Sequence, residues 1–449
     1  MKYLCTLLIV TISCVLDATE FRLATFSADV TIPLNHRCMG VIPTKSKRVA
    51  DPLLAHGFVL SDGKQTVVLC ALDWCEVRNG AFDQWREALA KAAGTVRENV
   101  LVTALHQHDA PVIDRDAATI LAAAGLTDEL YHVAWHDKTL ARVSQAVRDS
   151  LELATPVTHF GISETPVLQI ASNRRVVLEN GTVSYGRGSR SGGNKYFAAA
   201  PEGDIDSMLK TITFFNNDKP LLQMHHYATH PMSYYGQGVV SADFVGLARA
   251  RLQRQDQSIR QIFVPGCAGD ITAGKFNNGS EGHRQELIDR LYQAMAKAAD
   301  NTKRYQLQQL NIRNTKLQLP FHPGDHLTVK RLEADIANEK LSVEKRILAA
   351  MGLASRRRVA SGQAIDFPCV DLGAAQILLF PGESFIGYQL MAQAAAKNKF
   401  VMCLAYGESW PGYIPTAAIF AENFKDSWLW VGPGSEKAIR QAIADVLRK

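Results

Sequence analysis

The sequence lacks several features that would assign it to a specialised class of protein. It has no dense basic block, since 49 lysines and arginines are scattered among 44 acidic residues and the net charge is only +5. This balance gives no support for nucleic-acid binding. Beyond the N-terminal region there is no long uncharged apolar run, no internal repeat and no low-complexity segment. These absences argue against a mature chain that crosses a membrane and against a repeat architecture.

Cysteines are few and far apart. The chain has eight, of which Cys5 and Cys14 lie in the N-terminal region and none forms a CxxC pair. This spacing excludes a dense disulfide framework and a CxxC metal knuckle. Cys70 and Cys403 lie in apolar, strand-like runs, and we expect each to be a buried free thiol. Whether the other cysteines form one or two disulfides is left open, because the sequence does not determine their pairing.

The N-terminus is typical of an export signal. Lys2 supplies a positive charge, and the stretch 3–16 is apolar but too short to span a membrane comfortably. We therefore interpret residues 1–20 as a signal peptide, cleaved near Ala18, and expect a periplasmic or secreted protein. Residues 11–14 resemble a lipoprotein box but lack its aliphatic residue three positions before Cys14, so lipid anchoring is the weaker alternative.

The rest of the chain has the composition of a globular protein, with 47% hydrophobic and 21% charged residues in a total length of 449. Strand-like runs at 54–60 and 66–73, a helical pattern at 78–93 and a further strand at 100–105 give a β-α-β rhythm. A charged helical pattern at 329–353 indicates a helical insertion. We predict a layered α/β/α domain with a mixed sheet over residues 21–449, either one large domain or two intimate subdomains.

The most informative segment is 100–111, which reads V-L-V-T-A-L-H-Q-H-D-A-P. An apolar, β-branched run ends in His106 and His108, whose side chains would point to the same side of a strand. They would lie at the carboxyl end of that strand, where open α/β sheets bind their ligands. Neutral imidazoles bind zinc and act as general bases. The alternative is a pair of hydrogen-bonded loop histidines.

Four further segments place chemically useful residues after apolar runs. They are His225–Pro231, Pro265–Thr272, Phe380–Glu383 and Tyr406–Thr416. Each is weak alone, because a Pro-Gly-Glu turn or a histidine before proline is usually structural. Their recurrence predicts that a layered sheet brings several of them to one edge.

Taken together, these segments resemble the catalytic domain of the neutral/alkaline (non-lysosomal) ceramidases. The similar motifs occur in family order from about Phe21 to the C-terminus. They are His106-Gln107-His108-Asp109-Ala110-Pro111, Asn173-Arg174-Arg175, Thr229-His230-Pro231-Met232-Ser233, Ser241-Ala242-Asp243, Gly269-Asp270-Ile271-Thr272, Pro381-Gly382-Glu383 and Tyr413-Ile414-Pro415-Thr416.

The resemblance implies a single Zn²⁺ held by His106, His230, Glu383 and Tyr413, with Tyr406 as a competitor for the tyrosine position. Such a ligand set leaves room for a water, which zinc activates for hydrolysis.

The resemblance also implies roles around the metal. His108 would be the general acid/base, and Arg174 would stabilise an oxyanion or hold a substrate carboxylate or hydroxyl. Asp270 and Thr272 would line the site or orient a ligating histidine.

The sequence departs from the family pattern outside the ligand set. Asp109-Ala110 stands where the family has Ser-Gly, and Thr272-Ala273 stands where it has Ser-Pro. The downstream helix is shortened around residues 417–424, and we expect no C-terminal β-sandwich domain before Lys449. These changes bear on the acyl-chain pocket. The sequence therefore supports the assignment as a zinc hydrolase more strongly than it supports ceramide as the substrate.

The sequence thus predicts an exported, zinc-dependent hydrolase that cleaves a small-molecule or lipid amide. It allows peripheral contact with a membrane and predicts no nucleic-acid partner. It leaves the oligomeric state open. A zinc esterase, an amidohydrolase of another substrate class and a non-enzymatic exported binding protein are the alternatives. Metallo-β-lactamase-like enzymes need His-x-His-x-Asp-His, whereas here Asp109 follows His108 directly. Barrel amidohydrolases need an eightfold β-α repeat, which the pattern does not contain.

Overall fold

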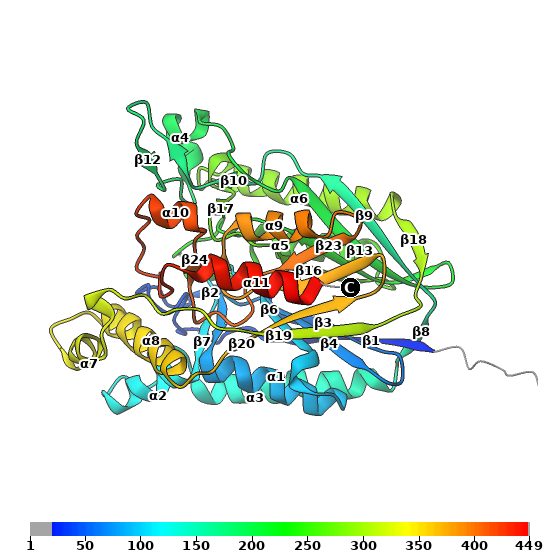
Figure 1. Ribbon diagram of the computed structural model, residues 1–449, viewed down its shortest axis with the longest axis horizontal. Coiled ribbons are helices and arrows are strands. Elements are labelled where there is room, and N and C mark those ends of the chain that lie inside the picture. The colour runs from blue at the N-terminus through cyan, green and yellow to red at the C-terminus, as the bar shows by residue number, and fades with distance from the viewer. Residues whose placement is uncertain (1–19, 448–449) are drawn as a thin grey trace, which may run out of the picture.

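The computed structural model describes residues 20–447 and has a mixed α/β fold (Figure 1). The export signal predicted for residues 1–20 lies outside the described residues, except for Glu20. None of the described helices is both long and apolar enough to span a bilayer. The layered α/β/α class predicted from the sequence is confirmed, and its strands are divided among three larger sheets.

The first sheet is built from the N-terminal third of the chain. Its strands lie in the order β6-β4-β3-β1-β8, where β4 and β6 are parallel and the other neighbours antiparallel. The bounds are β1 Phe21–Asp29, β3 Leu54–Ser61, β4 Thr66–Leu72, β6 Val100–Ala104 and β8 Thr155–Val157.

The second and third sheets repeat this arrangement, because each contains one parallel pair at an edge. The second has the order β16-β14-β13-β9-β18, with β14 and β16 parallel, and the third has the order β19-β20-β21-β23, with β21 and β23 parallel. The bounds are β9 His159–Pro166, β13 Met208–Asn216, β14 Lys219–Tyr227, β16 Arg260–Pro265, β18 Lys303–Gln306, β19 Asn311–Leu317, β20 Ile365–Asp371, β21 Ala375–Leu379 and β23 Phe400–Leu404.

Short two-stranded ladders connect the loops between the sheets. They pair β2 Arg48–Val49 with β15 Val239–Val240, β5 Glu76–Arg78 with β7 Val112–Asp114, β10 Ser172–Asn173 with β17 Ile271–Thr272, β11 Val176–Val177 with β12 Val183–Ser184, and β22 Glu383–Ser384 with β24 Tyr413–Ile414.

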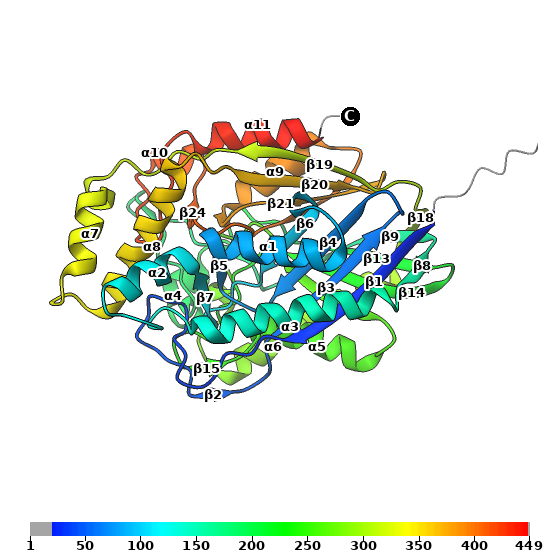
Figure 2. The same ribbon diagram turned by 90° about the horizontal axis from the view of Figure 1, so that it is seen from below.

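Helices cover the outer faces of the sheets. Helices α1 and α3 pack on the first sheet, as Figure 2 shows from below, while α5 and α6 pack on the second and α9 and α11 on the third. The bounds are α1 Asn79–Ala93, α2 Arg115–Ala123, α3 Val133–Leu151, α4 Lys195–Ala199, α5 Asp243–Gln255, α6 Glu281–Asp300, α7 Val329–Ala337, α8 Val343–Ala360, α9 Ile386–Ala395, α10 Ala417–Ala421 and α11 Ser435–Leu447.

Helix α1 illustrates why these elements form. Phe82, Trp85 and Leu89 recur at helical spacing and are buried against the first sheet. The helix ends at Gly94, whose φ of +66° and N–H bond to the carbonyl of Ala90 form a left-handed cap. Amphipathic helices of this kind leave the opposite faces of the sheets free to pack on one another.

An apolar core fills the space between the three sheets. Phe58 and Leu60 of the first sheet, Phe214 and Met224 of the second, and Ile377 of the third belong to one buried cluster. Helices outside and sheets inside therefore bury both faces of most strands, which explains the nearly continuous apolar runs of β4, β6 and β21.

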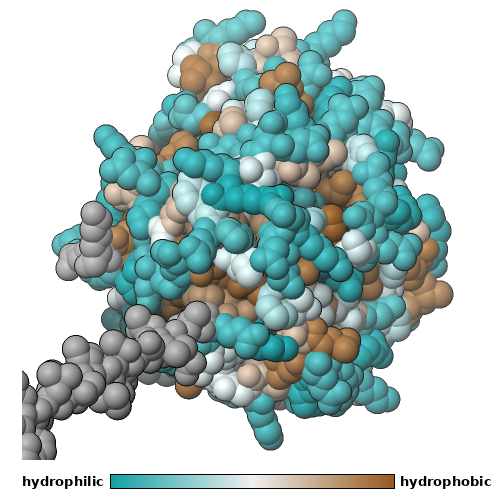
Figure 3. All heavy atoms as spheres, turned by 90° about the vertical axis from the view of Figure 1, so that its right-hand side faces the viewer, coloured by the Kyte–Doolittle hydropathy of each residue, from teal (hydrophilic) through white to brown (hydrophobic). Residues whose placement is uncertain are grey.

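The carboxyl ends of the three parallel pairs point to the same side of the molecule, away from the face on which β1 begins (Figure 1). Figure 3 shows that β1-entry face, where hydrophilic residues predominate and apolar residues are interspersed. At the opposite end the sheets are joined: the Thr103 hydroxyl donates to the carbonyl of Ala405 at 2.6 Å, and the N–H of Ala405 donates to Pro265 at 3.0 Å. Loops from all three sheets thus meet at one place.

Two sequence expectations about local structure are wrong. The helical pattern at 329–353 is two helices, because Ser342 caps a new helix by accepting the N–H of Lys345. Strand β6 ends at Ala104, so His106 and His108 do not project from a strand; His106 instead has a left-handed backbone with φ +67°. Among the described cysteines, Cys70 and Cys403 are buried and free as expected, and so are the other four.

Candidate metal centre

His106 is fixed by the chain that follows the neighbouring strand β4. Its N–H donates to the carbonyl of Trp74 at 2.8 Å, and its ring Nδ1 lies 3.0 Å from the carbonyl of Cys75. The ring of Tyr406 stacks on it, with centroids 4.2 Å apart and planes 17° apart. A non-glycine residue in the left-handed region is strained, and such strain is concentrated at functional sites.

His230 is oriented by a different loop in the same way. It follows β14, and its Nδ1 lies 2.6 Å from the carbonyl of Ala268 and 2.9 Å from that of Ile271. A carbonyl can only accept, so Nδ1 carries the proton on both His106 and His230. In the neutral form each ring therefore presents the lone pair of Nε2.

Glu383 and Tyr413 are neighbours in the ladder formed by β22 and β24. The N–H of Glu383 donates to the carbonyl of Gly412 at 2.9 Å, and the N–H of Tyr413 donates to Trp428 at 3.0 Å. The two side chains thus lie side by side although they follow different strands of the third sheet, β21 and β23.

The two imidazoles converge on the carboxylate. One oxygen of Glu383, Oε2, lies 3.3 Å from Nε2 of His106 and 3.0 Å from Nε2 of His230. All three residues are at most 3% exposed. The sequence-predicted ligands His106, His230 and Glu383 are therefore brought together, and His106, His108 and His230 have ring nitrogens within 4.8 Å of one another.

The donor set fits a divalent cation. Two Nε2 lone pairs that face one carboxylate oxygen repel it, and a proton on one ring relieves only one of the two contacts. A cation among the three atoms relieves both, and imidazole nitrogens with a carboxylate oxygen are ligands that zinc accepts. The backbone carbonyls on Nδ1 provide the outer hydrogen bonds that ligating histidines normally have.

The pKa values of the cluster are shifted because its ionisable side chains are buried close together. Burial acts to raise the pKa of Glu383, but the positive charge of a protonated His106 and the close contacts with both rings hold that pKa well below its usual range. Burial acts to lower the pKa of His106, and the charge of Glu383 outweighs it and raises that pKa. Burial together with the charge of Arg174 lowers the pKa of His230 to about 4. At neutral pH Glu383 is thus an ionised carboxylate, and His230 is a neutral imidazole whose Nε2 lone pair can bind a metal.

His108 lies beside the cluster with its Nδ1 free of hydrogen-bond partners. Its ring centroid is 5.1 Å from that of His106 and 5.8 Å from that of His230. Burial, and then the charges of His106 and His230, hold its pKa well below the usual value. His108 is therefore a neutral base with one nitrogen available, next to the cation-binding atoms.

Arg174 and Tyr413 contact each other beside the cluster. Nη1 of Arg174 donates to the Tyr413 hydroxyl at 3.0 Å, and the guanidinium carbon lies 5.6 Å from the centroid of the Tyr413 ring. Burial raises the pKa of Tyr413 well above its usual value, although Arg174 opposes this shift. The Tyr406 hydroxyl is buried and without a hydrogen-bond partner, so the structure leaves both tyrosines close to the cluster.

Asp270 and Thr272 hold the surrounding loops rather than a histidine side chain. The Asp270 carboxylate accepts the N–H of Ile386 at 2.7 Å and the Asn173 amide at 3.0 Å, and its carbonyl accepts the N–H of Arg174. The Thr272 hydroxyl accepts the N–H of Gly274. His230 is oriented by the carbonyls of this same loop, so the segment 268–272 positions the site through its backbone.

Two neighbours of the cluster were not identified from the sequence. Glu76 has a carboxylate oxygen within 4.8 Å of His106 and Glu383, and Tyr235 places its ring 5.2 Å from that of His108. Glu76 lies just after β4, so the rule of polar residues after apolar strands could have found it. Tyr235 lies in an irregular loop, and no sequence signal marks it.

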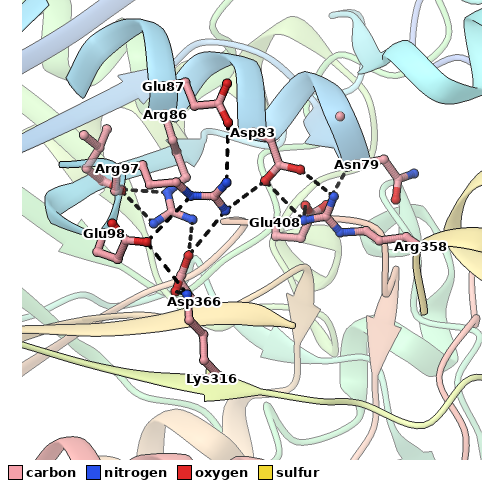
Figure 4. Close-up of polar contacts among 12 residues, drawn as sticks. Asn79, Asp83, Arg86, Glu87, Arg97, Glu98, Lys316, Arg358, Asp366 and Glu408 are labelled. Carbon is pink, nitrogen blue, oxygen red and sulfur yellow. Dashed lines mark hydrogen bonds and ion pairs between the residues drawn. The ribbon is translucent and has the colours of Figure 1, made fainter. Parts of the chain in front are cut away.

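Figure 4 shows an ion network that includes Asp83, Arg358 and Glu408. The Glu408 carboxylate accepts the N–H groups of Asn79 at 2.8 Å and Trp410 at 3.1 Å and lies 3.3 Å from Arg358, which also pairs with Asp83 at 2.7 Å. The carbonyl of Glu408 accepts the N–H of Gly382 at 3.0 Å. The network therefore fastens helices α1 and α8 to the Pro-Gly-Glu turn.

Comparison with known proteins gives a match in structure. No protein-family model matches the chain, and neither does any curated protein sequence. The fold is similar to that of neutral ceramidase from Pseudomonas aeruginosa, with a TM-score of 0.70 and 15% identity over 96% of this chain and 74% of the other. It is also similar to a ceramidase complexed with C2, with a TM-score of 0.69 and 14% identity over 95% and 75% of the two chains. The chain thus has the ceramidase fold that its motifs predict.

Proposed function

We propose that this protein is a zinc-dependent hydrolase that cleaves an amide bond of an N-acyl compound, with ceramide-like lipid amides as the first class to test. The observation that carries the proposal is the convergence of Nε2 of His106 and His230 on one oxygen of Glu383. Support comes from the fold, which is similar to that of two solved ceramidases.

In the proposed centre His106, His230 and Glu383 hold zinc, and Tyr413 supplies the fourth ligand. Zinc in such a site acts as a Lewis acid toward a carbonyl group and toward water. The fourth ligand is the one that the structure constrains least. The Tyr413 hydroxyl accepts a hydrogen bond from Arg174, whereas the Tyr406 hydroxyl has no hydrogen-bond partner. We assign Tyr413 because it pairs directly with Glu383 in the β22–β24 ladder.

The remaining side chains supply proton transfer and charge stabilisation. His108 is neutral and has a free Nδ1, so it can take a proton from the attacking water and return it to the departing nitrogen. Arg174 carries a permanent positive charge beside Tyr413, so it can stabilise the negative charge that develops on the carbonyl oxygen. Asp270 and Thr272 keep the Arg174 and His230 loops in place.

The finer points of the proposal concern location and substrate. Export through the signal predicted at residues 1–20 would place the enzyme outside the cytoplasm, where lipid amides and peripheral membrane contact are accessible. One solved ceramidase of this fold is complexed with C2, which makes short-chain N-acyl sphingoid bases a reasonable probe. An esterase of the same metal centre remains the second candidate, since the same groups stabilise an ester transition state.

The experiment is a hydrolysis assay with the zinc-loaded protein on matched amide and ester substrates. N-acyl sphingosines of short and long chain, an N-acyl amino acid and the corresponding esters would be compared by mass spectrometry of the products. We expect cleavage of at least one amide and its loss on chelation, with recovery on adding zinc. Cleavage of esters alone would contradict the amidase, and equal rates after full zinc removal would contradict the metal mechanism.

A further inference from the structure

A second buried carboxylate lies beside the proposed ligands and has no part in the function described above. An oxygen of Glu76, a nitrogen of His106 and an oxygen of Glu383 lie within 4.8 Å of one another. Glu76 is 0% exposed. It follows Cys75 directly, and the carbonyl of Cys75 is the group that holds the His106 ring. The same turn therefore fixes Glu76 and a proposed metal ligand.

Both oxygens of Glu76 already have donors. Oε1 accepts from the indole nitrogen of Trp428 at 3.1 Å, and Oε2 accepts from Nη1 of Arg78 at 2.8 Å. The main-chain carbonyl of Trp428 in turn accepts the N–H of Tyr413. Trp428 thus ties Glu76 to the β24 strand that carries Tyr413. With its oxygens occupied, Glu76 can act on the centre through its charge without entering the ligand set.

Arg78 compensates the charge of Glu76 only in part. Arg78 is 0% exposed and serves two carboxylates, since its Nε also lies 3.5 Å from Asp114. Arg78 is thus shared between Glu76, which lies inside the cluster, and Asp114, which lies outside it, so part of the negative charge of Glu76 remains next to His106 and Glu383. Buried charge is costly unless it is compensated. A divalent cation at Glu383 compensates it, and the field of Glu76 favours that cation.

We propose that Glu76 is a positioning residue of the metal centre, whose buried negative charge strengthens divalent-cation binding at His106, His230 and Glu383 while its own oxygens stay on Arg78 and Trp428. The inference rests on the proposed function, because it presupposes that this cluster binds zinc.

The test measures metal affinity. Metal-free full-length protein and its Glu76→Gln variant are titrated with Zn²⁺ against a competing chelator, and with Co²⁺ while the visible absorption is recorded. Glutamine keeps the length and one oxygen acceptor but removes the charge. We expect zinc binding to weaken by about 10-fold to 100-fold, as for other partners outside the ligand set. The cobalt spectrum is expected to keep its wild-type shape, because the ligands are unchanged.

A matched control separates charge at the centre from general damage around Arg78. Asp114→Asn removes the other carboxylate that faces Arg78, at a residue equally buried but outside the cluster. This variant is expected to keep the wild-type zinc affinity. Thermal melting of each metal-free variant checks folding. If Glu76→Gln does not fold, Glu76→Met, which leaves Arg78 paired with Asp114 alone, is used with the same expectation.

Three results would overturn the inference. They are equal zinc affinity of wild type and the Glu76 variants, a cobalt spectrum that reports the loss of a ligand, and an equal loss of affinity in Asp114→Asn. In each of these cases zinc still binds the wild-type protein and the proposed function stands. If the wild-type protein binds no zinc, the proposed function fails and the role of Glu76 fails with it.

Discussion

At the scale of single residues, His108 lies against the proposed ligands with a free Nδ1 and a depressed pKa. If it transfers protons, His108→Gln should lower kcat by about 100-fold to 10,000-fold. Zinc content should not change, because His108 is outside the proposed ligand set. Steady-state kinetics and metal analysis on the same preparation check both statements. Full activity in the variant would assign proton transfer to another group, and loss of zinc would make His108 a ligand.

A second residue-scale prediction concerns stability in acid. His225 is buried between the Thr211 hydroxyl at 2.8 Å and the Gln261 amide oxygen at 2.9 Å, and burial lowers its pKa to about 4. The unfolded histidine titrates near 6.5. Between these pH values His225 is protonated in the unfolded chain but not in the folded protein. The free energy of unfolding is therefore fully retained above pH 6.5 and decreases as the pH falls toward 4.

The variant His225→Gln should therefore lose less stability than wild type between pH 7 and pH 5, by about 2 kcal/mol. Urea unfolding at the two pH values measures the difference. His226 and His230 have depressed pKa values too, so both proteins should weaken in acid, and only the difference between them reports on His225. Identical pH dependence of the two proteins would show that folding does not lower the pKa of His225.

Residue identities could be predicted from the sequence where a short motif carries them. His106, His230 and Glu383 follow apolar runs and do converge in space. The reason given for the first histidine was wrong, because its side chain is directed by a left-handed backbone rather than by strand alternation. Glu76 was missed because its partners, Trp428 and Glu383, come from distant parts of the chain and only the fold brings them together.

At the scale of elements, the β22–β24 ladder depends on a glycine. Gly412 has φ +60°, and a Cβ there would lie 1.8 Å from the carbonyl of Trp428. Gly412→Ala should destabilise the protein by more than about 2 kcal/mol, which exceeds the cost of a left-handed alanine alone. It should also weaken zinc binding, because Gly412 holds the N–H of Glu383.

Chemical denaturation and zinc titration check this prediction, and Gly181→Ala is the control. Gly181 has φ +79° but open space around its Cα, so only the backbone cost of about 1–2 kcal/mol is expected. Equal effects of the two alanines would mean that the close approach of Trp428 to the ladder does not matter.

The attachment of helix α8 is a second element-scale feature. Arg358 is buried between Asp83 and Glu408, whereas its neighbour Arg357 makes an exposed pair with Glu333. Arg358→Met should cost about 3 kcal/mol, since it leaves the buried carboxylate of Glu408 without its ion-pair partner, whereas Asp83 keeps its pair with Arg97. Arg357→Met should cost less than about 0.5 kcal/mol. Urea unfolding compares them. A similar effect of both would show that the network in Figure 4 does not fasten the helix.

Element boundaries were predictable where periodicity was strong and failed where a cap intervened. The strands β3 and β4 and the helix α1 lie where the apolar pattern placed them. The continuous helix predicted over 329–353 breaks between α7 and α8, because the cap formed by Ser342 competes with a propensity that is helical throughout. The local sequence pattern alone does not determine whether the helix continues through Ser342 or begins again at it.

At the scale of the whole molecule, the layered α/β class followed from the β-α-β rhythm, but the division into three sheets did not. That division depends on pairings such as β9 with β18 and β19 with β20, which join segments far apart in sequence. Its consequence is functional: each sheet contributes a parallel pair, and the loops after β6, β14, β21 and β23 supply His106, His230, Glu383 and Tyr413.

The central claim is that these three sheets build one zinc site, and metal analysis tests it most directly. Zinc in the purified protein would be measured by inductively coupled plasma mass spectrometry, beside the His106→Ala/His230→Ala variant. The account predicts about one zinc per chain in the wild type and none in the variant, whose fold is checked by circular dichroism. A wild-type protein that holds no stoichiometric zinc after exposure to the metal would contradict the account.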